Sequence, residues 1–540
     1  MTFNSLSTQM NTRQVARNTP QTQPAGNAPV QQVQNNAGGY VFELDPMKKL
    51  DRFLMIGTTG GTYYQREQNL LNENVESIVS LIKTNGKAVV DRVVEISKAG
   101  RAKNNDFALL VLALAFAHGD DFTKQHAKEN LNLVARTGTH FFHFVQFATG
   151  LRGWGRSLKK AVQKWYSDKK VDNLAYQVVK YKSRDGWDHR DVMRLAHVKP
   201  GNDIVRQNLY KYIVKGGEAL NKGDQVPSIL VAVEQAKTAD EKTLLKLIQD
   251  HRLTHEMIPN EHKNSAAIWE ALLPHMGTTA LIRNLNKLTA VGLIKPLSQT
   301  SKFIIGQLTD EEVIKRDRIH PLSALVAKKI YASGRGDKGS LVWTPDSNIV
   351  GALEQTFYHG FKAIEPSGKN MLLALDVSGS MGNAMSGTQY LSCCEGAAVM
   401  AMVTARTEPN TYVFGFAGTF KPLGITKNDT LESAMQKAYD HNFGTTDCAL
   451  PMTYALQNRL DVDCFSVYTD NETYFGSVHP FQAMRNYRNK MGKPEAKLVV
   501  CGMSASRFTI ADPTDAGMLD VVGFDTETPK FISEFAAGRL

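Results

Sequence analysis

"LLALDVSGSMG", residues 372–382, is an apolar run that ends at an aspartate and gives way to serines and glycines. An apolar run of this length, bounded by glycine and serine, is typical of a buried strand. Asp376, Ser378 and Ser380 follow at two-residue intervals, so one loop can direct three oxygens toward a common point. The stretch therefore predicts a strand whose carboxyl end carries a polar site.

Strand-like runs alternate with helical segments throughout the last third of the chain. We expect strands at 371–375, 411–416, 465–468, 497–501 and 521–524, and helices at 391–406, 431–441 and 480–491. This alternation indicates an α/β domain with a doubly wound, mostly parallel sheet that helices cover on both faces. Ligands of such sheets bind beyond the carboxyl ends of the strands.

Two further loops carry oxygen atoms that match those after the first strand. "FGTTDCALP" offers Thr446 just before a helix, and "SVYTDNET" offers Asp470 at the end of another strand. Two carboxylates, several hydroxyls and water suit a hard divalent cation such as Mg²⁺. One alternative is that these residues only form turns and helix caps. A catalytic serine at Ser380 is less favoured, because the G-x-S-x-G pattern and a nearby histidine in the sequence are both missing.

The chain before this domain has a different character. Residues 1–38 are rich in Gln, Asn, Thr and Pro and have few large apolar side chains, which predicts a disordered tail. From residue 39 to about 340, apolar residues recur at helical spacing, which predicts successive helix hairpins in a degenerate HEAT-like solenoid. An irregular all-helical domain is the alternative.

Charge and cysteine usage separate the two parts further. Up to residue 360 the chain has 48 Lys and Arg against 34 Asp and Glu, and after it 15 against 19. The first part is therefore expected to bind a polyanion. All five cysteines lie in the last third without a C-x-x-C pair, which indicates reduced thiols. Because no signal peptide or membrane span is evident, we expect a soluble, cytoplasmic protein that does not bind a membrane.

The segment from 151 to 200 is strongly basic and contains interleaved aromatic residues. It has 13 Lys and Arg against 5 Asp, with aromatics at Trp154, Trp165, Tyr166, Tyr176, Tyr181 and Trp187. Cationic side chains neutralise phosphates and aromatic faces stack on unpaired bases, so the pattern favours RNA binding. The alternative is that the aromatic residues belong to the helix core and the lysines to a solvated face.

Two sets of motifs resemble known families. The D-x-S-x-S loop, the later threonine and the T-D at a further strand end resemble the metal-ion-dependent adhesion site of von Willebrand factor A domains. That resemblance implies that Asp376, Ser378, Ser380, Thr446 and Asp470 bind the cation. The usual Gly-Gly-Thr is Gly444-Thr445-Thr446 here, so either threonine could be the ligand, and we favour Thr446.

The basic segment supplies the second resemblance. "GRSLKKAVQKWY" and "GWDHRDVMRLAHVKP" resemble motifs of the TROVE domain, and "YVFELDPMKKLDRFLMIGTTGGTYYQREQ" supports them. The chain is identified as a member of the Ro autoantigen family, of bacterial or phage type. Membership implies HEAT-like helices over 39–360 that form a ring, closed by a von Willebrand factor A domain over 361–540. It also implies a protein that is not an enzyme.

The resemblance further implies a role in RNA quality control. A Y or Y-like RNA would bind the outer basic surface, single-stranded 3′ ends of misfolded RNA would enter the ring, and an exoribonuclease such as polynucleotide phosphorylase is a possible partner. The RNA-binding candidates are Lys159, Lys160, Lys180, Lys182, His189, Arg190, Arg194, His197 and Lys199. A different class of function stays open, in which the metal site binds a protein ligand and the helices serve only as scaffold.

Overall fold

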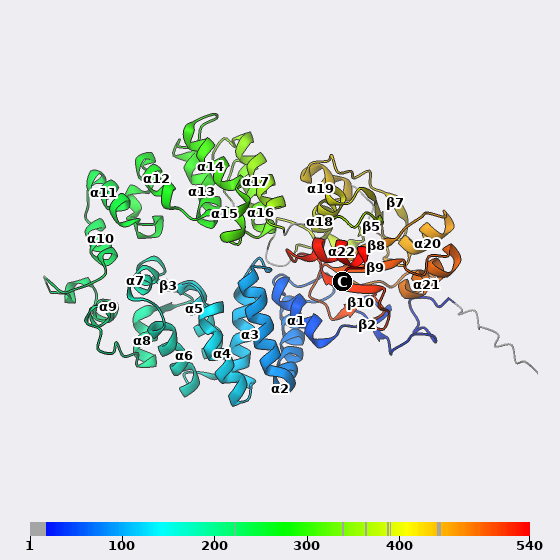
Figure 1. The fold of residues 1–540 in the computed structure, drawn as a ribbon, viewed down its shortest axis with the longest axis horizontal. Coiled ribbons are helices and arrows are strands. Elements are labelled where there is room, and N and C mark those ends of the chain that lie inside the picture. The colour runs from blue at the N-terminus through cyan, green and yellow to red at the C-terminus, as the bar shows by residue number, and fades with distance from the viewer. Residues whose placement is uncertain are drawn as a thin grey trace, which may run out of the picture.

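The computed structural model describes residues 18–540 except 222, 337–339, 362–363, 386–387, 389 and 440–443. A long series of helices follows a curved path away from a compact α/β domain and returns to it (Figure 1). The predicted combination of a helical domain and a mainly parallel sheet is therefore confirmed.

The helical domain consists of consecutive helices that pack mainly on their near neighbours. Its helices are α1 Pro46–Met55, α2 Glu67–Ala99, α3 Asp106–His118, α4 Asp121–Val134, α5 Gly138–Arg152, α6 Arg156–Ser167, α7 Val171–Lys180, α8 His189–Ala196, α9 Ile204–Lys215, α10 Ser228–Ala236, α11 Glu241–His251, α12 Ala266–Leu272, α13 Thr278–Ala290, α14 Gln299–Thr309, α15 Glu311–Arg316, α16 Pro321–Ala332 and α17 Ser347–His359.

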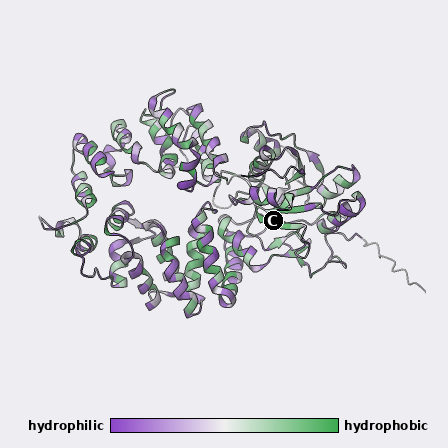
Figure 2. Ribbon diagram, viewed as in Figure 1, coloured by the Kyte–Doolittle hydropathy of each residue, from purple (hydrophilic) through white to green (hydrophobic). Residues whose placement is uncertain are grey.

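Local sequence explains where many of these helices begin and which faces they bury. Asp120, Asp188 and Asp240 each accept a hydrogen bond from a backbone N–H of the following first turn, at α4, α8 and α11. Helix α3 is apolar on all sides because neighbouring helices enclose it, whereas α6 buries one face only. Figure 2 shows the contrast, with hydrophobic residues dominant in α3 and hydrophilic residues frequent on the outer helices.

The α/β domain is built on a six-stranded sheet of order β11-β9-β8-β5-β6-β7, in which only β7 is antiparallel to its neighbour. The strands are β5 Asn370–Asp376, β6 Asn410–Phe416, β7 Phe420–Pro422, β8 Cys464–Thr469, β9 Lys497–Gly502 and β11 Met518–Val522. The helices are α18 Cys393–Thr407, α19 Leu431–Tyr439, α20 Leu450–Gln457, α21 Pro480–Met491 and α22 Thr528–Ala537.

The central strand β5 is buried on both faces. Leu373 and Leu375 pack into the apolar cluster that includes α18, α19 and α22, while Leu372 and Ala374 pack with α20 and α21. A continuous apolar run fits such a strand, because a parallel sheet covered on both sides has no solvent-facing positions. The sequence prediction placed the last strand at 521–524, but β11 begins at Met518 and ends at Val522. A helix just after Thr446 was predicted without bounds, and it is α20, whereas α22 was not predicted.

One end of the helical path is anchored to the sheet by buried ion pairs. Arg52 of α1 lies 2.6 Å from Asp520 of β11, and Arg101, just after α2, lies 2.6 Å from Asp525. The carbonyl oxygen of Arg101 is also 3.2 Å from Nε2 of His320, which lies at the start of α16 near the far end of the path. The two ends of the helical domain therefore meet at the α/β domain.

Helix α16 anchors the other end. Nζ of Lys328 lies 2.7 Å from Glu432 of α19, and Nζ of Lys329 lies 2.7 Å from Glu395 of α18. Because both ends of the helical path contact the α/β domain, the chain closes on itself as a ring of elements, as the family resemblance implies (Figure 1).

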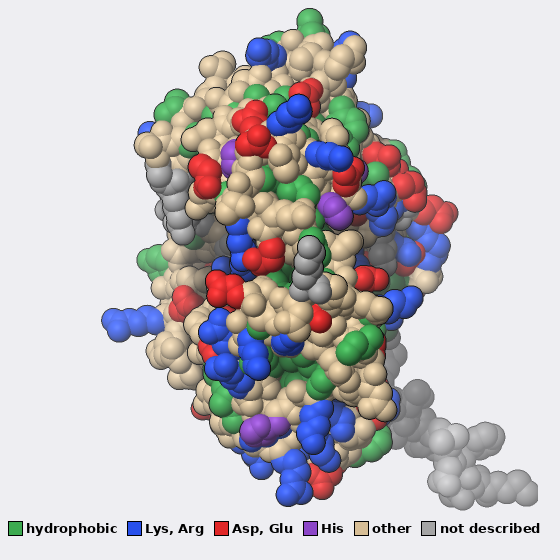
Figure 3. Space-filling view, turned by 90° about the vertical axis from the view of Figure 1, so that its left-hand side faces the viewer, with side chains coloured by type: hydrophobic (Ala, Val, Ile, Leu, Met, Phe, Trp, Pro, Cys, Tyr) green, Lys and Arg blue, Asp and Glu red, His purple; other side chains and the backbone are tan. Residues whose placement is uncertain are grey.

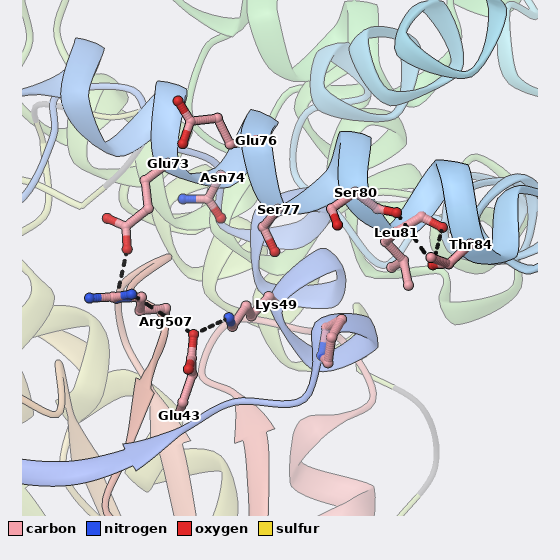
Figure 4. A pocket seen from close by; sticks show the side chains of 11 residues that line it. Glu43, Lys49, Glu73, Asn74, Glu76, Ser77, Ser80, Leu81, Thr84 and Arg507 are labelled. Atoms are coloured by element: carbon pink, nitrogen blue, oxygen red, sulfur yellow. Dashed lines mark hydrogen bonds and ion pairs between the residues drawn. The ribbon is translucent and has the colours of Figure 1, made fainter. Parts of the chain in front are cut away.

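A polar groove of about 360 Å³ marks the junction of the two domains (Figure 4). Arg507, which precedes strand β10 (Phe508–Thr509), lies 2.8 Å from Glu73 of α2. Glu43, in strand β2 (Tyr40–Glu43), lies 2.6 Å from Lys49 of α1. These ion pairs are partly exposed, so each contributes little free energy to the stability of the junction and mainly fixes the positions of the side chains that meet there.

The prediction that residues 1–38 form a disordered tail is wrong for residues 18–38, and residues 1–17 lie outside the described residues. Gln21, Gln32 and Asn35 are buried, and strand β1 (Val33–Gln34) pairs with β2. Composition misled the prediction, because this polar segment is held by side-chain amides that bond to the α/β domain rather than by apolar burial.

None of the helices in the described part of the chain is sufficiently long and apolar to span a membrane. All five cysteines are buried free thiols.

Candidate functional site

The predicted metal-binding residues gather at one edge of the sheet. Strands β5 and β8 are parallel neighbours, so Asp376 at the end of β5 and Asp470 just after β8 lie at the same edge. The chain continues from β5 to β6 on one side, whereas β8 lies on the other. This reversal of strand order is where open α/β sheets leave a crevice for ligands.

Hydrogen bonds fix the loop that follows β5. The backbone N–H of Ser378 donates to Oδ1 of Asp376 over 2.9 Å, and the Thr469 hydroxyl donates to Oδ2 over 2.7 Å. Oγ of Ser378 and Oγ of Ser380 are 3.1 Å apart. All five predicted ligand residues are buried, namely Asp376, Ser378, Ser380, Thr446 and Asp470.

The carboxyl groups at this edge are in an environment that disfavours negative charge. Burial and the charge of Asp470 raise the pKa of Asp376 to about 7. Burial also raises the pKa of Asp470, although a hydrogen bond from Ser380 opposes the shift. Within the described chain, no Lys, Arg or His side chain forms an ion pair with either carboxylate. A bound cation would offset the free-energy cost of keeping two negatively charged carboxylates buried.

Two residues near the site were missed by the sequence analysis. Burial and the charge of Asp470 raise the pKa of Glu472 to about 8, and the "TDNE" spacing could have indicated this carboxylate. Tyr64 belongs to the helical domain, in the loop between α1 and α2. Burial and the charges of Asp470 and Glu472 raise the pKa of its phenol, so Tyr64 lies near the same edge.

The two threonines in the loop before α20 have different surroundings. Thr446 is buried and its carbonyl oxygen accepts a hydrogen bond from the N–H of Phe475 over 3.0 Å. Thr445 is only partly buried, and its hydroxyl lies so close to Gly418 that a Cβ there would be 2.7 Å away. Thr446 is therefore the more enclosed of the two threonines.

The donor set suits a magnesium-like ion. Among the residues described, no three His, Cys, Asp or Glu side chains are grouped so that they could hold a metal ion. A cation at this edge would therefore rely on two carboxylates, hydroxyl oxygens and retained water, which is how Mg²⁺ is usually bound.

A second candidate site lies on the helical domain. A groove of about 540 Å³ between α3, α4, α5 and α6 is lined by five cationic side chains and one carboxylate, Asp121. We call it the basic groove, and its cations are Lys124, Lys128, Arg152, Arg156 and Lys160. In the described part of the chain, none of the five forms an ion pair with an Asp or Glu side chain.

The basic groove contains one predicted residue and four that the sequence analysis missed. Lys160 was predicted, and Lys159 beside it on α6 is partly buried. The other four come from α4, the end of α5 and the start of α6, which lie up to 36 residues apart from Lys160 in the chain. Only the packing of successive helices brings them together.

Further predicted residues surround α8. Arg194 lines a separate pocket of about 470 Å³ together with Trp187, whose ring packs edge-on against Trp154 at 5.7 Å. Arg190, His197 and Lys199 are exposed. Figure 3 faces this end of the molecule and shows Lys and Arg side chains gathered on its lower half.

The two lysines around the end of α7 differ. Lys182 is exposed, whereas Lys180 is partly buried. Nζ of Lys180 lies 3.1 Å from the Tyr176 hydroxyl and above the rings of Tyr176 and Tyr181. Lys180 therefore has a packing role in addition to its charge.

The prediction that His189 contacts RNA is contradicted by its position. Its side chain is buried, Nδ1 lies 2.7 Å from the Tyr166 hydroxyl, and its ring is 4.7 Å from that of Phe142. Burial lowers the pKa of His189 to about 4, so it is neutral at neutral pH. Trp165 and Tyr166 are fully buried, which makes the core interpretation correct for these two aromatic residues.

Family models match both domains. A model described as the TROVE domain matches residues 33–255 and 245–330, and a model described as the Ro60 vWA domain matches residues 370–536.

Curated relatives match nearly the whole chain. RNA-binding protein RO60 of Deinococcus radiodurans is 42% identical over 529 residues, which cover 97% of this chain and 98% of the relative. RNA-binding protein RO60 of Caenorhabditis elegans is 34% identical over 585 residues, covering 94% and 90%. The crystal structure of the Deinococcus radiodurans RO (RSR) protein matches at 40% identity with a TM-score of 0.67, covering 92% of this chain and 100% of that chain.

Proposed function

The chain belongs to the Ro60 family of RNA-binding proteins, and we propose that it binds RNA mainly through the basic surface of helices α4–α8. The observation that carries this proposal is the basic groove, whose five cations form no ion pair with an Asp or Glu side chain in the described chain. Unpaired cations in a groove can each neutralise a phosphate and release a counterion, and this release supplies most of the sequence-independent affinity.

The division between phosphate and base contacts follows from the side chains. Lys124, Lys128, Arg156 and Lys160 would hold the backbone of the RNA in the basic groove. Arg194 and the partly buried Trp187 line a separate pocket that also contains Asp185 and Asp191, where a guanidinium and an indole face could hold an unpaired base. RNA with a duplex part and a single-stranded tail would use both features.

We further propose that the RNA partners are a Y or Y-like RNA and misfolded RNA with a single-stranded 3′ end. The role would be non-catalytic, in RNA quality control in the cytoplasm, with an exoribonuclease such as polynucleotide phosphorylase acting on the bound RNA. Family membership and the five buried free thiols support this proposal.

We also propose that Asp376, Ser378, Ser380, Thr446 and Asp470 hold Mg²⁺ or a similar divalent cation. Their burial, the raised pKa of both Asp376 and Asp470 and the oxygen-only donor set support it. The bound ion would supply positive charge between two carboxylates and a position for an outside oxygen ligand.

Filter binding of a hairpin RNA with a single-stranded tail, at 50 and 200 mM salt, tests the RNA proposal. We expect tight binding at the lower salt and a steep loss at the higher one. Weak, salt-insensitive RNA binding together with Mg²⁺-dependent binding of an acidic protein ligand would instead support the adhesion-type function.

A further inference from the structure

The polar segment of residues 18–39, which we call the strap, lies against the loops that carry two of the proposed metal ligands. Gln21 is fully buried although it is polar. Its Nε2 donates to Oδ1 of Asp447 over 2.7 Å and to the carbonyl of Val478 over 2.8 Å, and its Oε1 accepts from the Thr473 hydroxyl. One side-chain amide thus ties the loop of Thr446 to the loop that follows Asp470.

Asn35 makes a second connection to the loop after β8. Its Nδ2 donates to the carbonyl oxygens of Asn471 and Thr473, over 3.2 and 2.7 Å, and its Oδ1 accepts from the N–H of Gly39 over 2.8 Å. Gly39 is pressed against the same loop, because a Cβ at this position would lie 1.9 Å from the Thr473 carbonyl oxygen. The strap backbone therefore approaches the loop as closely as glycine allows.

The strap also binds the third carboxylate of this region. Nδ2 of Asn36 donates to Oε1 of Glu472 over 2.7 Å, and the N–H of Ala37 donates to Oε2 over 3.1 Å. Glu472 is buried and comes two residues after Asp470. These contacts hold the Glu472 carboxylate against the strap, two residues after Asp470.

We propose that the strap is a positioning element of the divalent-cation site, with Gln21 as its principal residue. The inference rests on the proposed metal site. Ser378 and Ser380 are fixed by their own loop, whereas the loops of Thr446 and Asp470 bond to each other directly, as from Phe475 to Thr446, and again through Gln21. Groups that orient metal ligands without touching the metal typically change affinity by about 10- to 100-fold when they are removed.

The test measures Mg²⁺ and Mn²⁺ affinity of the full chain by titration calorimetry. For Gln21→Ala we expect a dissociation constant about 10- to 100-fold higher than in the wild type. Asn36→Ala removes only one bond to Glu472 at an exposed residue, so it should keep the fold and weaken cation binding several-fold.

Gln34→Ala is the matched control. Gln34 belongs to the same strap, but its exposed side chain donates only to the Gly38 carbonyl over 3.0 Å, so cation affinity should not change. Circular dichroism of each variant reports whether the fold is retained.

The possible outcomes separate the two proposals. If the wild type binds no divalent cation, or if Asp376→Ala binds it as well as the wild type, the metal site itself is wrong. If the wild type binds, Asp376→Ala does not, and both Gln21→Ala and Asn36→Ala bind like the wild type, only the positioning role is overturned. If Gln21→Ala does not fold, Asn36→Ala still provides the test. An unchanged cation affinity of Asn36→Ala would then be enough to overturn the positioning role of the strap.

Discussion

The helical domain and the α/β domain place their functional charges in opposite environments. Three cations of the basic groove, among them Arg156 and Lys160, are exposed and the other two are half-buried, whereas Asp376 and Asp470 are 0% and 4% exposed. Water solvates the exposed cations in the free protein, so these charges cost little folding free energy before RNA binds. A buried carboxylate without a cationic partner has a high desolvation free energy. A proton that neutralises it or a metal ion that binds it must offset that free energy.

The buried titratable groups of the two domains also shift in opposite directions. Burial lowers the pKa of His189 to about 4, while burial and Asp470 raise the pKa of Asp376 to about 7. In each case burial favours the neutral form. The comparison teaches that His189 is buried as a neutral group with a hydrogen-bond partner, whereas Asp376 and Asp470 are buried carboxyl groups with which no cationic side chain of the described chain forms an ion pair.

The largest expected effect comes from removing charge from the basic groove. Replacing Lys124, Lys128, Arg156 and Lys160 with glutamine should lower the slope of log affinity against log salt by about three units. Near physiological salt this corresponds to a loss on the order of a hundredfold in RNA affinity. Filter binding across a salt series measures it. The matched control replaces four exposed lysines on other helices, Lys242, Lys246, Lys302 and Lys315, and should change the slope much less.

Removal of the metal should destabilise only the α/β domain. A cation that binds the folded form alone stabilises it by about 2.7 kcal/mol when its free concentration is a hundredfold above the dissociation constant. Chelation should therefore lower the melting temperature of the wild type, measured by calorimetry. Asp376→Ala should melt at the same temperature with and without Mg²⁺. A variant that still responds to Mg²⁺ would place the cation elsewhere.

The pH dependence of stability tests the burial of His189. Its pKa is about 6.5 when unfolded and about 4 when folded, so the unfolded chain binds more protons between these values. The stability that the neutral residue contributes is complete above pH 6.5 and is lost as pH falls toward 4, by about 2 kcal/mol at pH 5.

His189→Gln should flatten this dependence in urea unfolding experiments, because glutamine retains hydrogen-bonding capacity for Tyr166 but does not titrate. Some dependence should remain, since burial also lowers the pKa of His140 and of His320 to about 4. His197→Gln, at an exposed position, is the control and should leave the profile unchanged. A profile that His189→Gln does not alter would contradict the burial of this residue.

The smallest expected effect distinguishes two lysines of the basic segment. Lys182→Ala should lower the salt slope by about 0.7 without changing the melting temperature, because its side chain is exposed. Lys180→Ala should also lower the melting temperature, since its ammonium lies over two tyrosine rings, a contact worth roughly 0.5–1 kcal/mol. Equal melting temperatures for the two variants would argue against the packing role of Lys180.

Much of the α/β domain could be predicted because its signals are local. An apolar run followed by Asp376, Ser378 and Ser380 gives both the strand and the loop at its end. A helix after Thr446 was expected, but its bounds were not predicted, because α20 is short and begins next to Pro451. The Asp376 and Asp470 pair was predictable because parallel neighbours end at the same edge.

The parts that sequence reasoning missed depend on contacts between distant segments. The strap has the composition of a disordered tail, and its order comes from amide bonds such as Gln21 to Asp447, 426 residues apart. The basic groove needs the packing of four helices. His189 was misread because its exposure depends on Phe142 and Tyr166, whose positions the local sequence does not specify.

RNA binding across a salt series, for the wild type, the groove variant and Asp376→Ala with Mg²⁺ and with chelator, tests the division of labour most directly. We expect Asp376→Ala and chelation to leave the RNA affinity and the salt slope nearly unchanged, while the groove variant loses about three units of slope. The division of labour would be contradicted if Asp376→Ala lost RNA binding with its fold intact while the groove variant bound RNA like the wild type.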